Sequence, residues 1–205
     1  MEDTYRTIKS QSKGYYKAKG SKFIAYAFPV KTENEIKDIL SQLKKEHHSA
    51  RHHCFAWRLG TETITWRAND DGEPSSTAGK PILGQLQRFG LTRVLLVVVR
   101  YFRGTLLGTG GLIQAYRSAA ADALAKAQIV KKIIAVQYRL LFTYQQMNEV
   151  MRIVEQENLN VDETRFEMNC ELTLSVRKST AEKTEKTFTR IPGVKIKNVD
   201  KLLKK

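Results

Sequence analysis

The sequence predicts a mixed α+β protein with two domains, residues 1–130 and 131–205. In the first half, the apolar run at 94–99 contains no polar residue, which is typical of a short strand buried on both faces. In the second half, the hydrophobic pattern alternates between strand and helix periods over six elements. Between the halves, at 128–134, the composition shifts and two lysines interrupt the apolar pattern, so we place the domain boundary there.

The elements of the first domain follow from hydrophobic spacing and from helix start and stop signals. In chain order they are a strand at 22–30, a helix opened by the capping box 32–35, alternating strands at 53–59 and 64–68, a helix between Pro81 and Gly90, the strand at 94–99, and an alanine-rich helix at 112–127. We expect this last helix to pack closely on the sheet through its small residues and Tyr116.

The second domain shows a repeated strand and helix pattern. The predicted elements are a strand at 135–142, a helix with Tyr144, Met147, Met151 and Val154 on one stripe, strands at 159–166 and 170–176, a helix opened by the capping box 179–182, and a strand at 194–199. This order, βαββαβ, predicts a ferredoxin-like split motif.

The composition indicates a basic protein of a reducing compartment. The 205 residues include 35 Lys and Arg against 21 Asp and Glu, a net charge of +14, and both halves are basic, with 20 basic against 11 acidic residues before 131 and 15 against 10 after it. A nucleic acid or another anion is therefore the first partner to consider. No apolar run approaches the roughly 18 residues of a membrane span, and the N-terminus lacks an apolar signal core, so we expect a cytoplasmic protein without membrane association. The two cysteines lie far apart in the sequence, so we expect no disulfide.

Two glycine-rich polar loops, 69–80 and 100–111, carry the candidate functional residues. The second is predicted to lead into the helix at Leu112, and free N–H groups at a helix start attract anions. It is not a Walker A loop, and it is equally compatible with a tight connection that needs positive φ, with Thr109 as N-cap. Nearby arginines favour phosphate or an RNA backbone. The predicted RNA- or phosphate-binding residues are Lys80, Arg100, Tyr101, Arg103, Gly108, Thr109, Gly110, Gly111 and Arg117.

The acids of the first loop, Asp70, Asp71 and Glu73, are predicted to line a pocket. They could act as magnesium ligands or a general base, or they could form a polar turn close to a helix start. A second cluster spans His47 to Cys54, but neighbouring side chains on one strand point in opposite directions, which argues against a metal site. We predict a buried structural thiol at Cys54, and no metal or cofactor.

Four sequence blocks identify the chain as a member of the YigZ/IMPACT family by resemblance. They are HHCFAWRLG at 52–60, DDGEPSSTAGKPIL at 70–83, QRFGLTRVLLVVVRYFRGTLLGTGGL at 87–112 and AYR at 115–117, and the family usually has Gly where Ser76 and Arg103 stand. The resemblance implies a first domain similar to domain IV of elongation factor G and to the second domain of a small-subunit ribosomal protein. It implies a second domain similar to the last domain of that factor.

The resemblance and the charge together predict a translation-linked protein that binds RNA or the ribosome, without sequence-specific DNA recognition. Eukaryotic members carry an additional N-terminal RWD domain, for which we expect no counterpart before Lys22. One alternative is an enzyme acting on a small phosphorylated substrate, with phosphate at 108–111 and Asp70 or Glu73 as acid, base or metal ligand. Another is a protein-interaction module. An open basic groove between the two loops would favour nucleic acid, and an enclosed acidic pocket would favour a small ligand.

Overall fold

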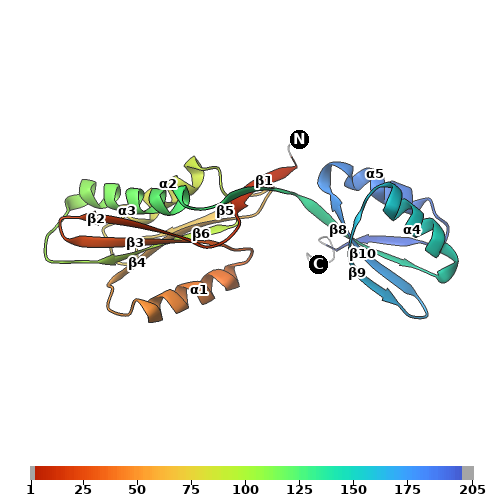
Figure 1. The fold of residues 1–205 in the computed structure, drawn as a ribbon, viewed down its shortest axis with the longest axis horizontal. Helices are drawn as coiled ribbons and strands as arrows, with labels where there is room; N and C mark the ends of the chain where they lie inside the picture. Colours follow the sequence, from red (N-terminus) through yellow and green to blue (C-terminus); the bar gives the residue numbers. More distant parts are fainter. Residues whose placement is uncertain (1–2, 200–205) are drawn as a thin grey trace. The chain divides into compact units, whose positions relative to one another are not determined.

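The computed structural model describes residues 3–199, which form five α-helices and eleven strands arranged in three sheets (Figure 1). The mixed α/β class predicted from the sequence is confirmed. The chain divides into two compact units: one is Tyr5–Lys132, and the other combines the described residues of Met1–Thr4 and Ile133–Lys205. Each unit has a core of its own.

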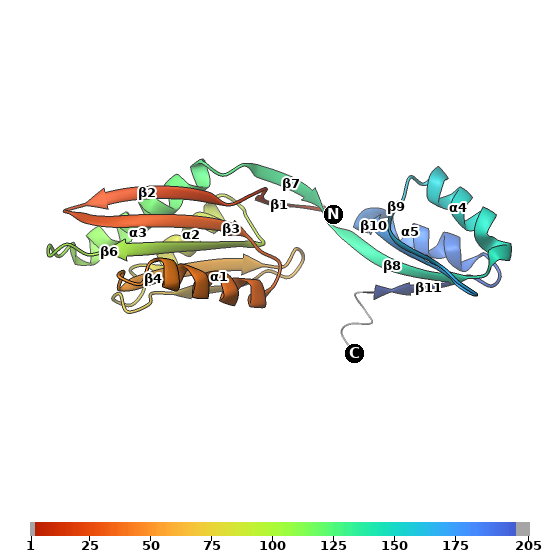
Figure 2. The ribbon, with the colours of Figure 1, turned by 60° about the horizontal axis from the view of Figure 1, so that its bottom comes forward.

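The larger unit is built on a five-stranded antiparallel sheet in the order β2-β3-β6-β4-β5 (Figure 2). Its strands are β2 (Ser12–Ala18), β3 (Ser21–Pro29), β4 (His52–Leu59), β5 (Thr65–Asn69) and β6 (Val94–Tyr101). The central strand β6 pairs with β3 on one side and β4 on the other. All six residues of the apolar run Val94–Val99 are completely buried, as the sequence predicted.

Helices cover both faces of this sheet (Figure 1). Helix α1 (Glu33–Glu46) packs on one face, where Ile36 and Leu43 join Trp57 and Leu59 in one core. The predicted cap is confirmed, because the Thr32 side chain accepts a hydrogen bond from the Glu35 N–H. Helices α2 (Gly79–Arg88) and α3 (Gly108–Ala125) pack on the opposite face and form the larger core. This coverage of both faces accounts for the apolar character of β6.

Helix α3 lies unusually close to strand β2 because both elements present small residues. Ala119 and Ala123 are completely buried, and Gly14 of β2 faces them. A Cβ added at Gly14 would overlap the backbone nitrogen of Ala123 and would lie 2.7 Å from the Ala119 carbonyl oxygen. The contact is therefore between two backbones, and it confirms the close packing expected of the alanine-rich helix.

Three strands of the structure have no counterpart in the sequence prediction. One is β2, and the others are β1 (Thr4–Ile8) and β7 (Ile129–Ile133), which pair as a two-stranded sheet. Strand β7 occupies the segment in which the charge pattern indicated a break, and Lys131 and Lys132 are exposed residues within it. In β2 the burial alternates, but the inward positions include Ser12 and Gly14, and β7 has no buried residue, so neither shows a clear hydrophobic alternation in its sequence.

The smaller unit contains its elements in the predicted order of strand, helix, strand, strand, helix and strand. They are β8 (Ala135–Phe142), a 3-10 turn η1 (Tyr144–Gln146) continued by α4 (Met147–Gln156), β9 (Asn160–Phe166), β10 (Cys170–Arg177), α5 (Lys178–Thr189) and β11 (Lys195–Asn198). The sheet is antiparallel in the order β11-β8-β10-β9, and its core includes Leu140, Leu172 and Phe188.

Two local predictions for this unit are wrong. The side chain of Tyr144, expected on the buried stripe, is 60% exposed, because the segment begins as a 3-10 turn that rotates this residue out of the α-helical stripe. The predicted capping box at Ser179 does not form, because α5 already begins at Lys178, and its N-cap Arg177 makes no side-chain cap hydrogen bond.

Arg177 has a different contact, with a residue near the start of the chain. Its Nε and an Nη donate to the two carboxylate oxygens of Asp3 at 2.6 and 2.9 Å. This is a bidentate arrangement of the kind that guanidinium and carboxylate groups favour. The hydrogen bond from Arg177 holds the pKa of the Asp3 carboxyl well below its usual range. The pair attaches residue 3 to the smaller unit.

Candidate functional site

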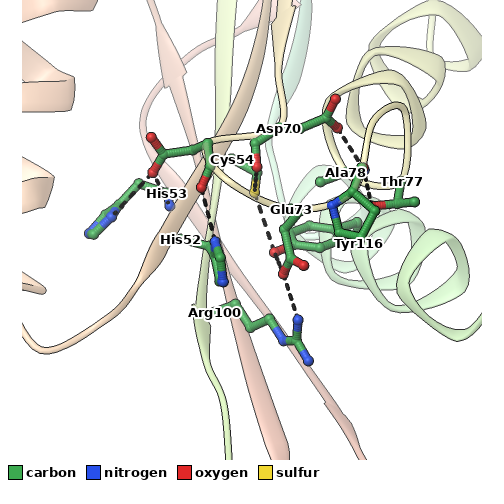
Figure 3. A network of polar contacts seen from close by, with 11 residues as sticks. His52, His53, Cys54, Asp70, Glu73, Thr77, Ala78, Arg100 and Tyr116 are labelled. Atoms are coloured by element: carbon green, nitrogen blue, oxygen red, sulfur yellow. Dashed lines mark hydrogen bonds and ion pairs between the residues drawn. The ribbon is translucent and has the colours of Figure 1, made fainter. Parts of the chain in front are cut away.

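The first glycine-rich loop is organised by the side chain of Asp70, which caps helix α2 (Figure 3). Its carboxylate accepts hydrogen bonds from the backbone N–H groups of Ser76 at 2.8 Å, Ala78 at 3.0 Å and Gly79 at 2.8 Å. Burial alone would raise the pKa of Asp70, but these backbone bonds, led by that of Gly79, lower it overall. The carboxylate that could have been a metal ligand or base is thus used to start a helix.

Replacing Asp70 with Ala should therefore lower the stability of the larger unit by about 2 kcal/mol, because three backbone donors lose a charged acceptor. The folded-state pKa of Asp70 is depressed, so its contribution is present above the unfolded-state pKa, about 3.9, and is lost as the pH falls. Urea unfolding at pH 7 and pH 3 measures this. The difference between the variant and the wild type should shrink at pH 3, and a difference independent of pH would contradict the assignment.

Asp71 and the adjacent histidines fix the turn that follows β5. Asp71 has positive φ, 41°, and its carboxylate accepts a hydrogen bond from the His53 N–H at 2.7 Å. Its carbonyl oxygen lies 2.9 Å from Nδ1 of His52, which therefore carries the proton, leaving Nε2 as the acceptor in the neutral ring. His53 is buried, and this burial lowers its pKa, so the ring is neutral at pH 7. His52 and His53 point to opposite sides of β4, as the alternation predicted.

The third acid of the loop, Glu73, belongs to a buried polar network (Figure 3). Its Oε1 accepts a hydrogen bond from an Nη of Arg100 at 2.7 Å and one from the hydroxyl of Tyr116 at 2.7 Å. The Cys54 sulfur in turn lies 3.3 Å from the Tyr116 hydroxyl oxygen and 3.0 Å from the carbonyl oxygen of Asp70. The network joins β4, β6, α3 and the first loop, so its members hold the structure together.

Burial dominates the ionisation of the two weak acids in this network. It raises the pKa of the Cys54 thiol and that of the Tyr116 hydroxyl well above their usual ranges, so both groups keep their protons at pH 7. A thiol without access to solvent and without thiolate character is a poor nucleophile. Cys54 is completely buried, which confirms the prediction of a structural thiol.

Arg100 lies at the base of the candidate site and is nearly inaccessible, with 5% of the residue exposed. Its guanidinium carbon lies 5.5 Å from the ring centre of Phe23 and 5.2 Å from that of Phe102. Only one of its nitrogens is paired with Glu73, and Nε is buried with no hydrogen-bond partner among the described residues. The sequence predicted a phosphate ligand at this position, whereas the structure gives its charge a carboxylate partner.

The second glycine-rich segment differs from the prediction. Gly108 to Gly111 form the first turn of α3 and not a loop before it, and the N-cap is Leu107 instead of Thr109. Gly108 has positive φ, 69°, but Gly110 and Gly111 do not, so positive φ is required at only one of these positions. The N-cap residue Leu107 makes no capping hydrogen bond, and no capping bond from another side chain is seen within residues 3–199. Its first N–H groups therefore depend on solvent or on a ligand for hydrogen bonding.

A pocket of about 400 Å³ lies between the two segments. Its lining comprises Arg51, His52, Gly72, Glu73, Pro74, Arg100, Phe102, Leu106, Leu107, Gly108, Thr109 and Leu112. The sequence patterns indicated Glu73, Arg100, Gly108 and Thr109 as binding or pocket residues, but gave no such indication for Arg51 or for the apolar side chains of the pocket. The adjacent residues Leu106 and Leu107, in an otherwise polar segment, are the sequence feature that could have predicted an apolar side of the pocket. Leu106 is 80% exposed and Phe102 41% exposed.

The other predicted binding residues lie outside this pocket. Lys80 and Arg117 line a second hollow of about 400 Å³, together with Ser76 and residues of α2 and α3. Tyr101 belongs to the opposite face of the sheet, where its hydroxyl lies 2.7 Å from Nδ1 of His47. Arg103 is exposed in the segment after β6. The predicted set is therefore distributed over two hollows and both faces of the sheet.

The two positions that depart from the family pattern have different environments. Ser76 has φ of 65°, a backbone region in which glycine is favoured. Arg103 has no positive φ, and its side chain comes close to Gly20, whose added Cβ would lie 3.7 Å from the Cβ of Arg103. Within residues 3–199, no three His, Cys, Asp or Glu side chains gather as a metal site would require. No helix in the same range is long and apolar enough to cross a membrane.

Comparison with known proteins identifies close relatives along most of the chain. The model of the Impact N-terminal domain matches residues 19–124. An IMPACT family member of Haemophilus influenzae is 35% identical over 84% of this chain and 87% of its own length. YigZ, an IMPACT family member of Escherichia coli, is 37% identical over 67% and 69%. A crystal structure of a hypothetical protein superposes with a TM-score of 0.72 at 26% identity, covering 96% of this chain and 97% of that one.

Proposed function

The chain belongs to the IMPACT family, and on that premise we propose that it is a translation-linked protein that binds RNA or a ribosome-associated partner. The proposal combines the family relationship with the net charge of +14. A protein with this excess of cations attracts phosphate backbones over a wide area of its surface.

The observation that carries the proposal is the contrast between the acids and the cations of the two glycine-rich segments. Asp70 caps a helix, Asp71 binds the His53 backbone, and Glu73 is buried against Arg100. In contrast, Arg103 and Arg117 are exposed and form no ion pair with any described residue. The three acids are thus engaged in contacts within the fold, and Glu73 is buried, while Arg103 and Arg117 face solvent without an ion-pair partner among the described residues. This arrangement suits a polyanionic partner.

The same contrast weighs against the alternative of a phosphate-processing enzyme. That function required Asp70 or Glu73 to serve as an acid, a base or a metal ligand. Each already has two or three hydrogen-bond donors, and Glu73 is paired with an arginine. Of the roughly four lone-pair sites of a carboxylate, three at Asp70 and two at Glu73 already accept hydrogen bonds within the fold, which leaves fewer for a substrate.

The proposal also covers the fold of each unit, the boundary between the units and the cellular location. We infer that the smaller unit is a ferredoxin-like domain, which its antiparallel order β11-β8-β10-β9 supports. We infer that the larger unit is an Impact-type domain similar to domain IV of elongation factor G, with a boundary near residue 130. We also infer a cytoplasmic location, as expected for a protein that acts in translation.

Salt dependence of RNA binding tests the proposal. Affinity for a single-stranded RNA should fall with increasing salt, with a slope of log affinity against log salt of about 0.7 for each phosphate contact. The variant Arg103→Glu should bind all sequences more weakly and should show a shallower slope, because it removes a cation and adds a repulsive charge. Fluorescence anisotropy at two or more salt concentrations measures both quantities.

The matched control is Lys37→Glu, which changes the net charge by the same amount. Lys37 is an exposed residue of α1, on the opposite face of the sheet from α2 and α3. Its replacement should alter the slope far less than Arg103→Glu does. Equal effects of the two variants would show that RNA binds only through non-specific attraction to the net charge. An RNA affinity that does not change with salt concentration would refute the proposal.

A further inference from the structure

The pocket beside the start of α3 is lined by both apolar side chains and positive groups, a combination that RNA-backbone binding does not require. The positive groups are the first turn of α3, represented by Gly108 and Thr109, and the exposed side chain of Arg51. The apolar lining includes the exposed side chains of Phe102 and Leu106. Such a pocket matches a ligand that has both an anionic group and an apolar body.

The charges around the pocket leave a net positive field. Glu73 and Arg100 neutralise each other through a 2.7 Å contact, and both are buried. Arg51 has no ion-pair partner among the described residues, and the end of the helix contributes a further partial positive charge. Arg100 also lines the pocket, and its Nε is buried without a hydrogen-bond partner among the described residues. An anion bound beside the first turn of α3 would accept hydrogen bonds from the helix and could neutralise Arg51.

The apolar lining is held open by rigid neighbours. The Arg100 guanidinium lies over the rings of both Phe23 and Phe102, and its hydrogen bond to Glu73 fixes its orientation. Leu107 and Leu112, which also line the pocket, are anchored in the core beneath α3. The volume of about 400 Å³ falls within the usual range for small-molecule sites, roughly 300–1,000 Å³. The pocket is therefore of a size for a compact ligand.

We propose that this pocket binds a small organic anion, a carboxylate or a phosphate ester with an apolar body. The anionic group lies at the first turn of α3 within reach of Arg51, and the body packs against Phe102, Leu106 and Leu107. Exposed leucines and aromatic rings that gather at a hollow mark a binding surface, because burying them on a ligand is favourable. This site does not depend on RNA binding, so either proposal can fail alone.

Four small probes separate the anionic from the apolar contribution. Phenyl phosphate and phenylacetate carry both parts, inorganic phosphate carries only the anion, and benzyl alcohol carries only the body. In NMR titrations, phenyl phosphate or phenylacetate should shift the backbone amide resonances of Gly108, Thr109 and Gly110. Its affinity should be about tenfold or more higher than that of inorganic phosphate or benzyl alcohol. Whichever of the first two binds better distinguishes a phosphate ester from a carboxylate.

Variants test whether binding occurs at this pocket. Leu106→Asp changes an 80% exposed residue, so the fold should persist while binding falls about tenfold or more through lost apolar contact and added repulsion. Arg51→Gln should also weaken binding of the anionic probes, whereas the matched control Arg117→Gln, in the other hollow, should leave it unchanged. The proposal is overturned if inorganic phosphate or benzyl alcohol binds as tightly as the combined probes, if none of the probes binds, or if Leu106→Asp retains full affinity.

Discussion

The variant Glu73→Gln is expected to lower the free energy of unfolding of the larger unit by about 3–5 kcal/mol. Glu73 and Arg100 are both almost fully buried, with side chains 3% and 6% exposed, and they meet at 2.7 Å. Removal of the negative charge leaves the Arg100 guanidinium buried without a counter-charge, and desolvation of a single charge is costly. Tyr116 would also lose a charged acceptor for its hydroxyl proton.

Tryptophan fluorescence during urea unfolding measures this effect in the relevant unit. The chain has two tryptophans, Trp57 and Trp66, and both lie within Tyr5–Lys132. The control is a double-mutant cycle with Glu73→Leu and Arg100→Leu, made singly and together. The double variant should be less destabilised than the sum of the single variants, because it contains no unpaired charge. Additive losses would show that the two residues do not stabilise each other.

The second large effect is expected from Gly14→Ala, which should destabilise the same unit by about 3 kcal/mol or more. The new Cβ would overlap the backbone of α3 at Ala123 and approach the Ala119 carbonyl oxygen at 2.7 Å. Overlap with a side chain can be relieved by a rotamer change, but overlap with backbone requires the helix to move away from β2. Such a shift would open the core beneath Tyr116 and the neighbouring alanines.

The matched control is the same substitution in a helix with free space. Gly84 lies inside α2 without positive φ, and no atom lies within 4 Å of a Cβ added there. Gly84→Ala should therefore raise the unfolding free energy by about 0.5–1 kcal/mol, since alanine favours helix over the unfolded chain. Opposite signs for the two variants are the expected result. A loss at Gly84 or a neutral effect at Gly14 would contradict the packing described here.

The fold was predictable where a segment satisfies one clear pattern. The run Val94–Val99 of strand β6 is apolar because helices cover both faces of the sheet. Helix α1 is predicted by the N-cap residue Thr32 and by the spacing of its buried apolar residues. Strands β2 and β7 were not predictable, because they expose much of their length and include lysines. The start of α3 was placed too late because glycines disfavour helix, whereas here the chain enters the helix at Gly108.

The position of the pocket was predictable, but the contacts around it were not. The sequence pointed to two glycine-rich segments, and a pocket lies between them. It could not show that Arg100 would meet Glu73, a contact across 27 positions, or that Tyr101 would turn to the other face of the sheet. Those outcomes depend on strand register and on which helix covers which face, and neither can be derived from local spacing.

The contact between Asp3 and Arg177 has a consequence for the order in which the protein can be completed during synthesis. The two residues are separated by 174 positions, and the chain leaves the ribosome from its N-terminus. Everything in Tyr5–Lys132 has been made long before Arg177 appears, so that unit can fold while Asp3 still lacks this partner. The first described residue of the chain is thus among the last to reach its native contacts.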